Sequence, residues 1–267
     1  ARGAVWAAVP ATDAGTGRAE AEMLARLAAV CPGDDDDWVF QSDPERTLVD
    51  ATSPAFDRGA STFFEWLDAT FGSQPGALVV GTWALAATTT PAAAARWSGT
   101  PTAFDVLGVS LKGALGTDSN LDDVFTAFAV HRGTVFPPVR LAWNVPWPAK
   151  ARRFASPVPV APTGASYVLV GVTGAPPGAK LRIEASWEDF GRMRWSVVKL
   201  DAQGRAMADV AITSLRLGTS TSMTLEPLDG VDRVLVVGVD VGSTEHPFDP
   251  AQGWWEPHGW LLTVEGE

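Results

Sequence analysis

Apolar residues in the first half of the chain recur at intervals of three and four, the periodicity of an amphipathic α-helix. This pattern predicts five helices, at residues 18–31, 60–71, 76–88, 100–111 and 119–131. Gly33 and Gly72 follow two of them and can end a helix, because glycine tolerates the left-handed conformation common there. Thr100-Pro101, and Ser119 with Asp122, match the capping patterns that begin helices. We therefore expect a mainly helical N-terminal domain.

Two of these helices should differ in how much of their surface is apolar. In the first, the charged residues lie opposite an apolar face formed by Met23, Leu24, Leu27, Ala28 and Cys31. Its charged side carries Arg18, Glu22 and Arg26, and Cys31 is expected to be a buried, inert thiol. Residues 76–88 are apolar almost all round, which predicts a helix buried inside a bundle.

Proline dominates the stretch from residue 134 to residue 163. It contains seven prolines, too many for a helix interior or a central strand. It also carries Trp143 and Trp147, which suggests that part of it packs on a domain. We expect residues 136–163 to form a linker or an extended segment that wraps a domain.

Beyond this stretch the apolar period changes to two, the period of a half-buried strand. Seven strands are predicted, at residues 167–172, 181–188, 195–200, 206–212, 222–226, 233–241 and 260–264. Asp201-Ala202-Gln203-Gly204 should form a hairpin turn. Short strands in this number are typical of an antiparallel β-sandwich. The predicted fold class is α+β, with a mainly helical domain at residues 1–135 and a β-sandwich at residues 164–267.

Composition and charge exclude several classes of function. The chain has 20 basic and 31 acidic residues, a net charge of −11, which argues against nucleic acid as a partner. A single cysteine excludes an intrachain disulfide and a multi-cysteine metal site, and three histidines leave little material for metal or triad chemistry. We also expect no transmembrane segment, since no apolar run is long enough. The first ten residues lack the apolar core of a signal peptide, so any secretion signal has been removed or never existed.

Two groups of carboxylates are candidates for chemistry. The run Asp34–Asp37 offers the oxygen ligands of Ca²⁺ but lacks the spacing of a calcium-binding loop, so a solvated acidic loop is preferred. Glu65 and Asp68, or the Asp34–Asp37 run, are candidates for a carboxylate-dependent hydrolase, although solvated surface carboxylates are the more ordinary interpretation. His131, near a helix end, fits capping or packing better than general-base catalysis.

Tryptophans supply another candidate site. Trp254 and Trp255 could stack on a sugar ring and form a possible ligand-binding platform, with core or edge packing as the preferred interpretation. Trp187, Trp195 and Trp260 occupy the apolar phase of their strands, so we expect them in the sandwich interior.

The helical half resembles part of the gluzincin zinc metallopeptidases, particularly secreted bacterial forms with a C-terminal β-sandwich. Trp38–Ser42 is similar to the segment around the family's third zinc ligand, and Arg58–Leu67 is similar to its downstream helix. The resemblance covers residues 17–132 and 160–267. In this family two histidines of a His-Glu-x-x-His helix and a Glu about 18 or more residues later bind zinc.

The resemblance also implies that the catalytic residues are missing. With Gln41 at the third-ligand position, Arg18 and Glu22 stand at the histidine positions and Ala19 at that of the general base. The expected function is therefore a non-catalytic, periplasmic, secreted or cell-surface protein that binds a protein partner or a surface glycan, or takes part in assembly. We expect no catalytic residue, metal ligand or cofactor, with Ca²⁺ as the one alternative. A carboxylate-dependent hydrolase and a glycan-binding module that uses Trp254 and Trp255 remain alternative functions.

Overall fold

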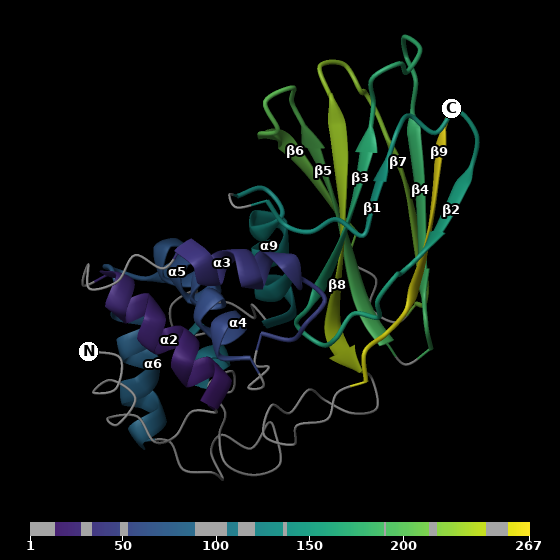
Figure 1. Ribbon diagram of the computed structural model, residues 1–267. Helices are drawn as coiled ribbons and strands as arrows, with labels where there is room; N and C mark the ends of the chain where they lie inside the picture. Colours follow the sequence, from purple (N-terminus) through teal and green to yellow (C-terminus); the bar gives the residue numbers. More distant parts are fainter. Residues whose placement is uncertain are drawn as a thin grey trace. The chain divides into compact units, whose positions relative to one another are not determined.

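The computed structural model (Figure 1) describes residues 14–27, 34–48, 53–88, 106–111, 121–135, 138–189, 191–213, 218–243 and 256–267. Within these residues the chain combines helices with two mostly antiparallel sheets, an α+β composition. It divides into two compact units. The first, the helical unit, contains the described residues up to Asp43 and from Thr47 to Phe128. The second, the β unit, contains Pro44–Arg46 and the described residues from Ala129 onward.

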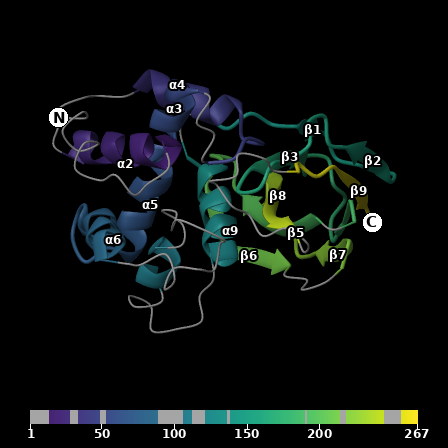
Figure 2. The ribbon, with the colours of Figure 1, turned by 90° about the horizontal axis from the view of Figure 1, so that it is seen from below.

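The helical unit is built from short helices. They are α2 (Ala14–Leu27), α3 (Asp34–Ser42), α4 (Pro54–Gly59), α5 (Ser61–Phe71), α6 (Ala77–Thr88), a helix at residues 106–111 and α9 (Leu121–Arg132). Only the part of α9 up to Phe128 belongs to this unit. α2 contacts α4 and α5, and α3 contacts α4, as can be followed in Figures 1 and 2. The helices predicted at 60–71 and 119–131 are confirmed by α5, which ends at Gly72, and by α9. Thr100-Pro101, Cys31, Gly33 and Ser119 lie outside the described residues.

The sequence pattern did not indicate α4, although a local signal was present. Ser53-Pro54 is an N-cap followed by proline, and the Ser53 Oγ accepts a hydrogen bond from the backbone N–H of Phe56 at 3.4 Å. Proline is suited to the first turn because it needs no hydrogen-bond partner there. With six residues, α4 is too short for its periodicity to be recognised.

Phenylalanine rings form the core of the helical unit. Phe40, Phe56, Phe63 and Phe128 come from four different helices, and all are buried. Phe63 meets Phe128 edge-on with 5.0 Å between ring centroids, and Phe40 is tilted against Phe56 at 5.1 Å. Such pairs add stability beyond the area that they bury.

Two expectations about helix surfaces are wrong. In α2 the charged side is packed: Glu22 is fully buried, whereas Leu27, expected on the packed face, is 48% exposed. The reason is that charged side chains on this side of α2 form ion pairs with those of neighbouring helices. α6 is not enclosed on every side, because Val80 is 52% exposed while Leu78 and Val79 are buried.

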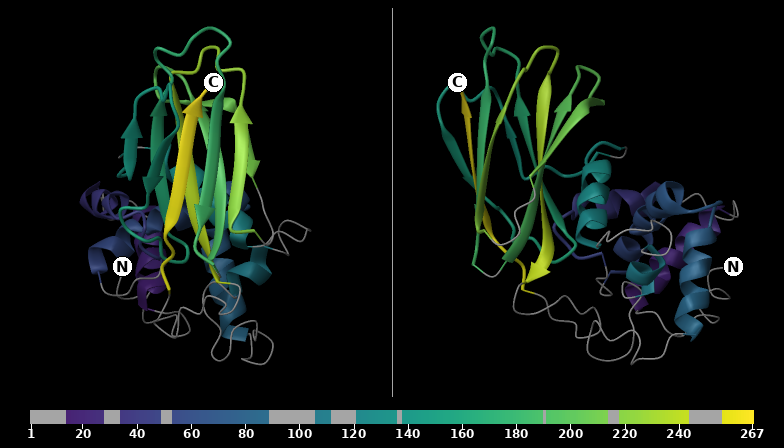
Figure 3. Two further views of the ribbon diagram at one scale, coloured as in Figure 1. Left: turned by 90° about the vertical axis from the view of Figure 1, so that its right-hand side faces the viewer. Right: turned by 180° about the vertical axis from the view of Figure 1, so that it is seen from behind.

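The β unit contains two sheets. The five-stranded sheet has the order β1 (Trp143–Val145), β3 (Ala165–Gly171), β8 (Arg233–Ser243), β5 (Gly191–Leu200) and β6 (Ala206–Thr213). The four-stranded sheet has the order β2 (Arg152–Ala155), β9 (Trp260–Gly266), β4 (Leu181–Trp187) and β7 (Ser220–Leu225), and faces the viewer in the left panel of Figure 3. β1 and β3 are parallel, and the other paired strands are antiparallel.

All seven predicted strands are confirmed, with β5 and β8 longer than expected. The proline-rich segment adds β1 and β2, each at an edge of one sheet. Edge positions suit this segment because proline cannot donate to a neighbouring strand. The predicted turn after β5 is also confirmed: the Asp201 Oδ1 accepts the backbone N–H groups of Gln203 and Arg205, each at 2.9 Å.

One hydrophobic cluster draws side chains from both sheets. The predicted alternation in β4 is confirmed, since Leu181, Ile183, Ala185 and Trp187 are all buried. Trp187, Trp195 and Trp260 are 8%, 3% and 2% exposed, so their prediction as interior residues is confirmed. Trp195 and Trp260 meet edge-on at 5.6 Å between ring centroids. These contacts make the two indoles central to the core of the β unit.

Candidate functional site

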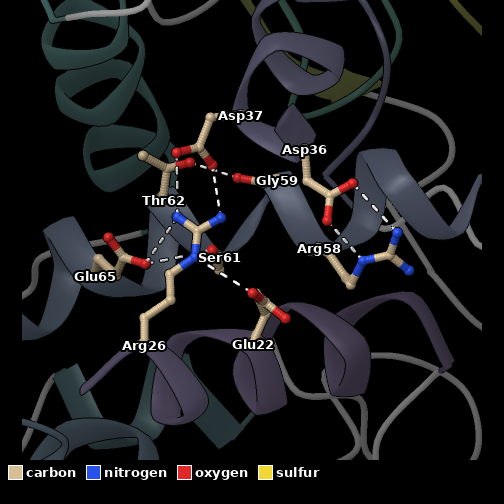
Figure 4. Close-up of polar contacts among 9 residues, drawn as sticks. All are labelled: Glu22, Arg26, Asp36, Asp37, Arg58, Gly59, Ser61, Thr62 and Glu65. Carbon is tan, nitrogen blue, oxygen red and sulfur yellow. Dashed lines mark hydrogen bonds and ion pairs between the residues drawn. The ribbon is translucent and has the colours of Figure 1, made fainter. Parts of the chain in front are cut away.

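The helical unit contains a network of arginines and carboxylates from α2, α3, α4 and α5 (Figure 4). Arg26 of α2 makes a two-pronged contact with Asp37 of α3, with Nη2 to Oδ1 at 2.8 Å and Nη1 to Oδ2 at 3.2 Å. Its Nη1 also donates to the Glu65 Oε1 at 3.2 Å, and its Nε to the Glu22 Oε1 at 3.5 Å. The Arg26 side chain is only 15% exposed, so this one cation connects α2, α3 and α5 in a largely buried position.

Two further ion pairs flank Arg26. Arg58 of α4 donates to both carboxylate oxygens of Asp36, at 2.7 and 3.2 Å. Arg18 of α2 donates through Nε to the Asp57 Oδ2 at 2.8 Å, and the Asp57 carboxylate is fully buried. Buried carboxylates need such partners, because an unpaired charge in the interior costs several kcal/mol.

The position of α3 explains how the network assembles. A Cβ atom on Gly59 would lie 2.3 Å from the carbonyl oxygen of Asp36 and 2.6 Å from the Cβ of Phe40, so only glycine permits this approach of α4 to α3. The adjacent Arg58 is thereby brought within reach of Asp36. Acidic residues are also favoured at the start of a helix, where the backbone N–H groups carry partial positive charge.

The Asp34–Asp37 run is therefore not the solvated loop that was expected. It begins α3, and the Asp36 and Asp37 side chains are bound by Arg58 and Arg26. The side chains of Asp34 and Asp35 lie outside the described residues. Because two of its four carboxylates already face arginines, the run is a poor match for a Ca²⁺ site, which needs six to eight oxygen ligands.

The environment shifts the pKa of the central groups. Burial alone lowers the pKa of Arg26, but the hydrogen bond to Asp37 and the surrounding carboxylates outweigh it, so the pKa is raised. Burial raises the pKa of Glu65, an effect that the charge of Arg26 opposes. The arginine therefore stays charged, and Glu65 accepts a proton more readily than an ordinary glutamate does.

A pocket of about 470 Å³ lies beside Arg26. It is lined by Met23, Arg26, Leu27, Glu65, Asp68, Ala69, Gly72, Gln74 and Pro75. Asp68, one of the two carboxylates proposed for hydrolysis, accepts the backbone N–H of Gly76 at 2.6 Å and of Leu78 at 2.9 Å. It thus anchors the start of α6, while Glu65 contacts Arg26 and the Ser61 Oγ. The two acids line the same pocket but have different hydrogen-bond partners.

The four positions that align with the zinc ligands and the general base of the gluzincins do not fit zinc. Arg18, Ala19 and Glu22 lie on α2 and Gln41 on α3, with all but the partly exposed Arg18 buried. A permanently protonated guanidinium cannot ligate a metal, and alanine supplies no donor, so only two oxygen-bearing side chains remain. Within the described part of the chain, no group of three His, Cys, Asp or Glu residues could hold a metal ion.

Sequence reasoning missed a buried pair in the β unit. The His258 Nδ1, just before β9, lies 2.6 Å from the Asp240 Oδ2 of β8, whose other oxygen accepts the Gly242 N–H at 2.7 Å. Burial raises the pKa of Asp240 to about 6, and the hydrogen bond to Asp240 raises the pKa of His258. The available signal was Asp240 itself, an acid within an apolar strand, since a buried carboxyl group requires a partner.

His131, Trp254 and Trp255 are the other residues for which the sequence indicated a role. His131 lies in the last turn of α9, where burial lowers its pKa. Trp254 and Trp255 lie outside the described residues, so the sugar platform stays a prediction. Over the described ranges, no helix has the length and apolar character needed to cross a membrane.

No family model and no curated protein matches the chain. Among solved structures it is similar to the enzymatically active domain of tailspike protein 4 from bacteriophage CBA120, with 18% identity, a TM-score of 0.29, and coverage of 43% of this chain and 15% of that one. The pre-peptidase C-terminal domain of collagenase from Bacillus anthracis has 8% identity and a TM-score of 0.29, covering 48% and 97%. The surface-associated copper-binding protein CorA of Methylomicrobium album BG8 has 11% identity and a TM-score of 0.27, covering 46% and 96%. TM-scores this low assign no function to the chain.

Proposed function

We propose that this chain is a non-catalytic, extracytoplasmic binding or assembly protein with a degenerate gluzincin-like helical domain. In this proposal the helical domain spans residues 1–135, a proline-rich segment follows at 136–163, and residues 164–267 form an antiparallel β-sandwich. The partner is a protein or a surface glycan. The observation that carries the proposal is the pairing of Glu22, at the second-histidine position, with Arg26 inside the helical unit.

The physical argument concerns what such a network can do. A catalytic zinc site keeps a coordination position open for water and needs a free carboxylate to activate it. Here α2 instead carries Arg18 and Arg26, which bind carboxylates of α3, α4 and α5. Breaking a buried pair by removing one partner costs roughly 3 to 5 kcal/mol, so the network favours a fixed arrangement of helices. A rigid scaffold of this kind suits binding or assembly.

The alternative hydrolase receives less support from the geometry. Asp68 is held by two backbone N–H groups, whereas Glu65 is held by Arg26 and the Ser61 Oγ, so the hydrogen bonds do not orient the two carboxylates toward each other. The glycan-binding alternative rests on Trp254 and Trp255. Glycan-array binding that is lost in Trp254→Ala would favour it.

The relation to gluzincins can be tested by restoring the motif. The variant combines Arg18→His, Ala19→Glu, Glu22→His and Gln41→Glu, and its control is Ala19→Glu alone. Because the spacing of the motif is intact, the proposal predicts that the restored variant gains about one zinc per chain by elemental analysis, whereas the wild type and the control do not. Circular dichroism checks that each variant is folded. A folded restored variant that binds no zinc would show that the resemblance is accidental.

A further inference from the structure

The pocket beside Arg26 combines an apolar wall with one carboxylate oxygen that accepts no hydrogen bond from the part of the chain that the structure describes. Met23 and Leu27 of α2 and Ala69 and Pro75 supply apolar surface, and Leu27 is exposed at the rim. The volume of about 470 Å³ is ample for one long side chain of a partner. A ligand that fits this wall needs an unbranched hydrocarbon stem.

Glu65 supplies the polar end of the pocket. Arg26 and the Ser61 Oγ both donate to its Oε1, at 3.2 and 3.4 Å. Its Oε2 accepts no hydrogen bond from the described residues and points away from Arg26 in Figure 4. The side chain is 35% exposed, so this oxygen is accessible to a ligand.

The charge around the pocket favours a cation. Among the described residues that line the pocket, Glu65 and Asp68 are acidic and Arg26 is basic, so the lining carries a net negative charge. Desolvation raises the pKa of Glu65, which means that its anionic form gains from another positive neighbour. An additional cation at Oε2 would supply that neighbour.

We propose that this pocket binds a lysine side chain of a partner protein, with its methylene groups on the apolar wall and its ammonium group donating to the Glu65 Oε2. Lysine fits better than arginine, because one free oxygen suits a compact ammonium group, whereas a guanidinium prefers two parallel acceptors. The inference rests on the proposed function, since it names the protein partner's chemistry at the same site.

The test uses Nα-acetyl-lysine methylamide as the probe, titrated into the full chain and followed by NMR. The norleucine methylamide, which lacks the ammonium group, and the Nε-acetylated probe are the ligand controls. Glu65→Gln should weaken binding of the lysine probe roughly tenfold or more, because a charge-assisted hydrogen bond is lost. The amide of glutamine can still accept from Arg26 and Ser61. Glu256→Gln, at an exposed position in the β unit, is the matched protein control and should bind as the wild type does.

A second variant keeps the test decisive if Glu65→Gln is unfolded. Ala69→Phe fills the exposed rim of the pocket without removing any member of the network, and should abolish binding. The proposal is overturned if the lysine probe does not bind, if norleucine methylamide binds equally well, or if Ala69→Phe leaves the affinity unchanged. None of these results bears on the zinc content of the restored variant, so a failure here is distinguishable from a failure of the proposed function.

Discussion

The helical unit and the β unit bury different kinds of interior. In the β unit, valines, leucines and three tryptophans fill the cluster between β4, β5, β8 and β9. In the helical unit, the phenylalanine core lies alongside a network in which Glu22 and Asp57 are fully buried. An apolar interior is stabilised by area and shape, whereas a charged one depends on every partner being present. The two units should therefore respond differently to the same kind of substitution.

The largest effect is expected in the apolar interior. Trp195→Ala removes a ring that packs on Trp260, and truncating a buried aromatic costs roughly 3 to 5 kcal/mol. Chemical denaturation followed by tryptophan fluorescence measures the free energy of unfolding. Leu261→Ala, at a 37% exposed position of β9, is the control and should cost far less. Equal losses would mean that Trp195 is not part of the core.

The charged interior should depend on Arg26 almost as strongly. Arg26→Met preserves much of the side-chain volume but leaves the buried Glu22 without this cation, which is expected to cost about 3 kcal/mol. Arg205→Met breaks an ion pair with Asp201 in which the arginine is 74% exposed, and should cost less than about 1 kcal/mol. Similar values for both variants would contradict a structural role for the network.

Replacing each of two glycines by alanine should change the stability of the helical unit in opposite directions. Gly59→Ala places a methyl group against the Asp36 carbonyl and should destabilise the helical unit by about 2 kcal/mol. Among the described residues, no atom beyond those of its own helix backbone would lie within 4 Å of a Cβ added to Gly81 of α6, so Gly81→Ala should stabilise the helix by about 0.5 to 1 kcal/mol. Thermal denaturation distinguishes the two. A neutral Gly59→Ala would show that α4 does not pack tightly on α3.

Another small effect concerns how the stability of the β unit depends on pH through His258. Since the pKa of His258 is raised in the folded state, its stabilisation is complete below its unfolded pKa and is lost as the pH rises through the folded value. The cost of His258→Gln should thus be larger near pH 6.5 than near pH 9, by about 1 kcal/mol. Denaturation at the two pH values measures it. A cost that does not change, or that grows with pH, would contradict a charged pair with Asp240.

The sequence predicted the two units unequally, for physical reasons. Alternation in β4 revealed its buried face because each inward residue there is apolar. The same reasoning assigned the wrong face of α2 to the interior. Hydrophobicity alone does not distinguish a solvated arginine from one that pairs with Asp37, 11 residues away in the sequence. Asp240 and His258 are 18 residues apart, and only the fold brings them together. β1 and β2 were obscured by the prolines around them.

We propose that arginine–carboxylate pairs lie in the helical unit where a gluzincin would bind zinc. The most direct measurement is the zinc content of the wild-type protein prepared without chelator, combined with digestion of a peptide library. We expect substoichiometric zinc and no cleavage above a mock preparation. Stoichiometric zinc, together with proteolysis that a chelator abolishes, would contradict it.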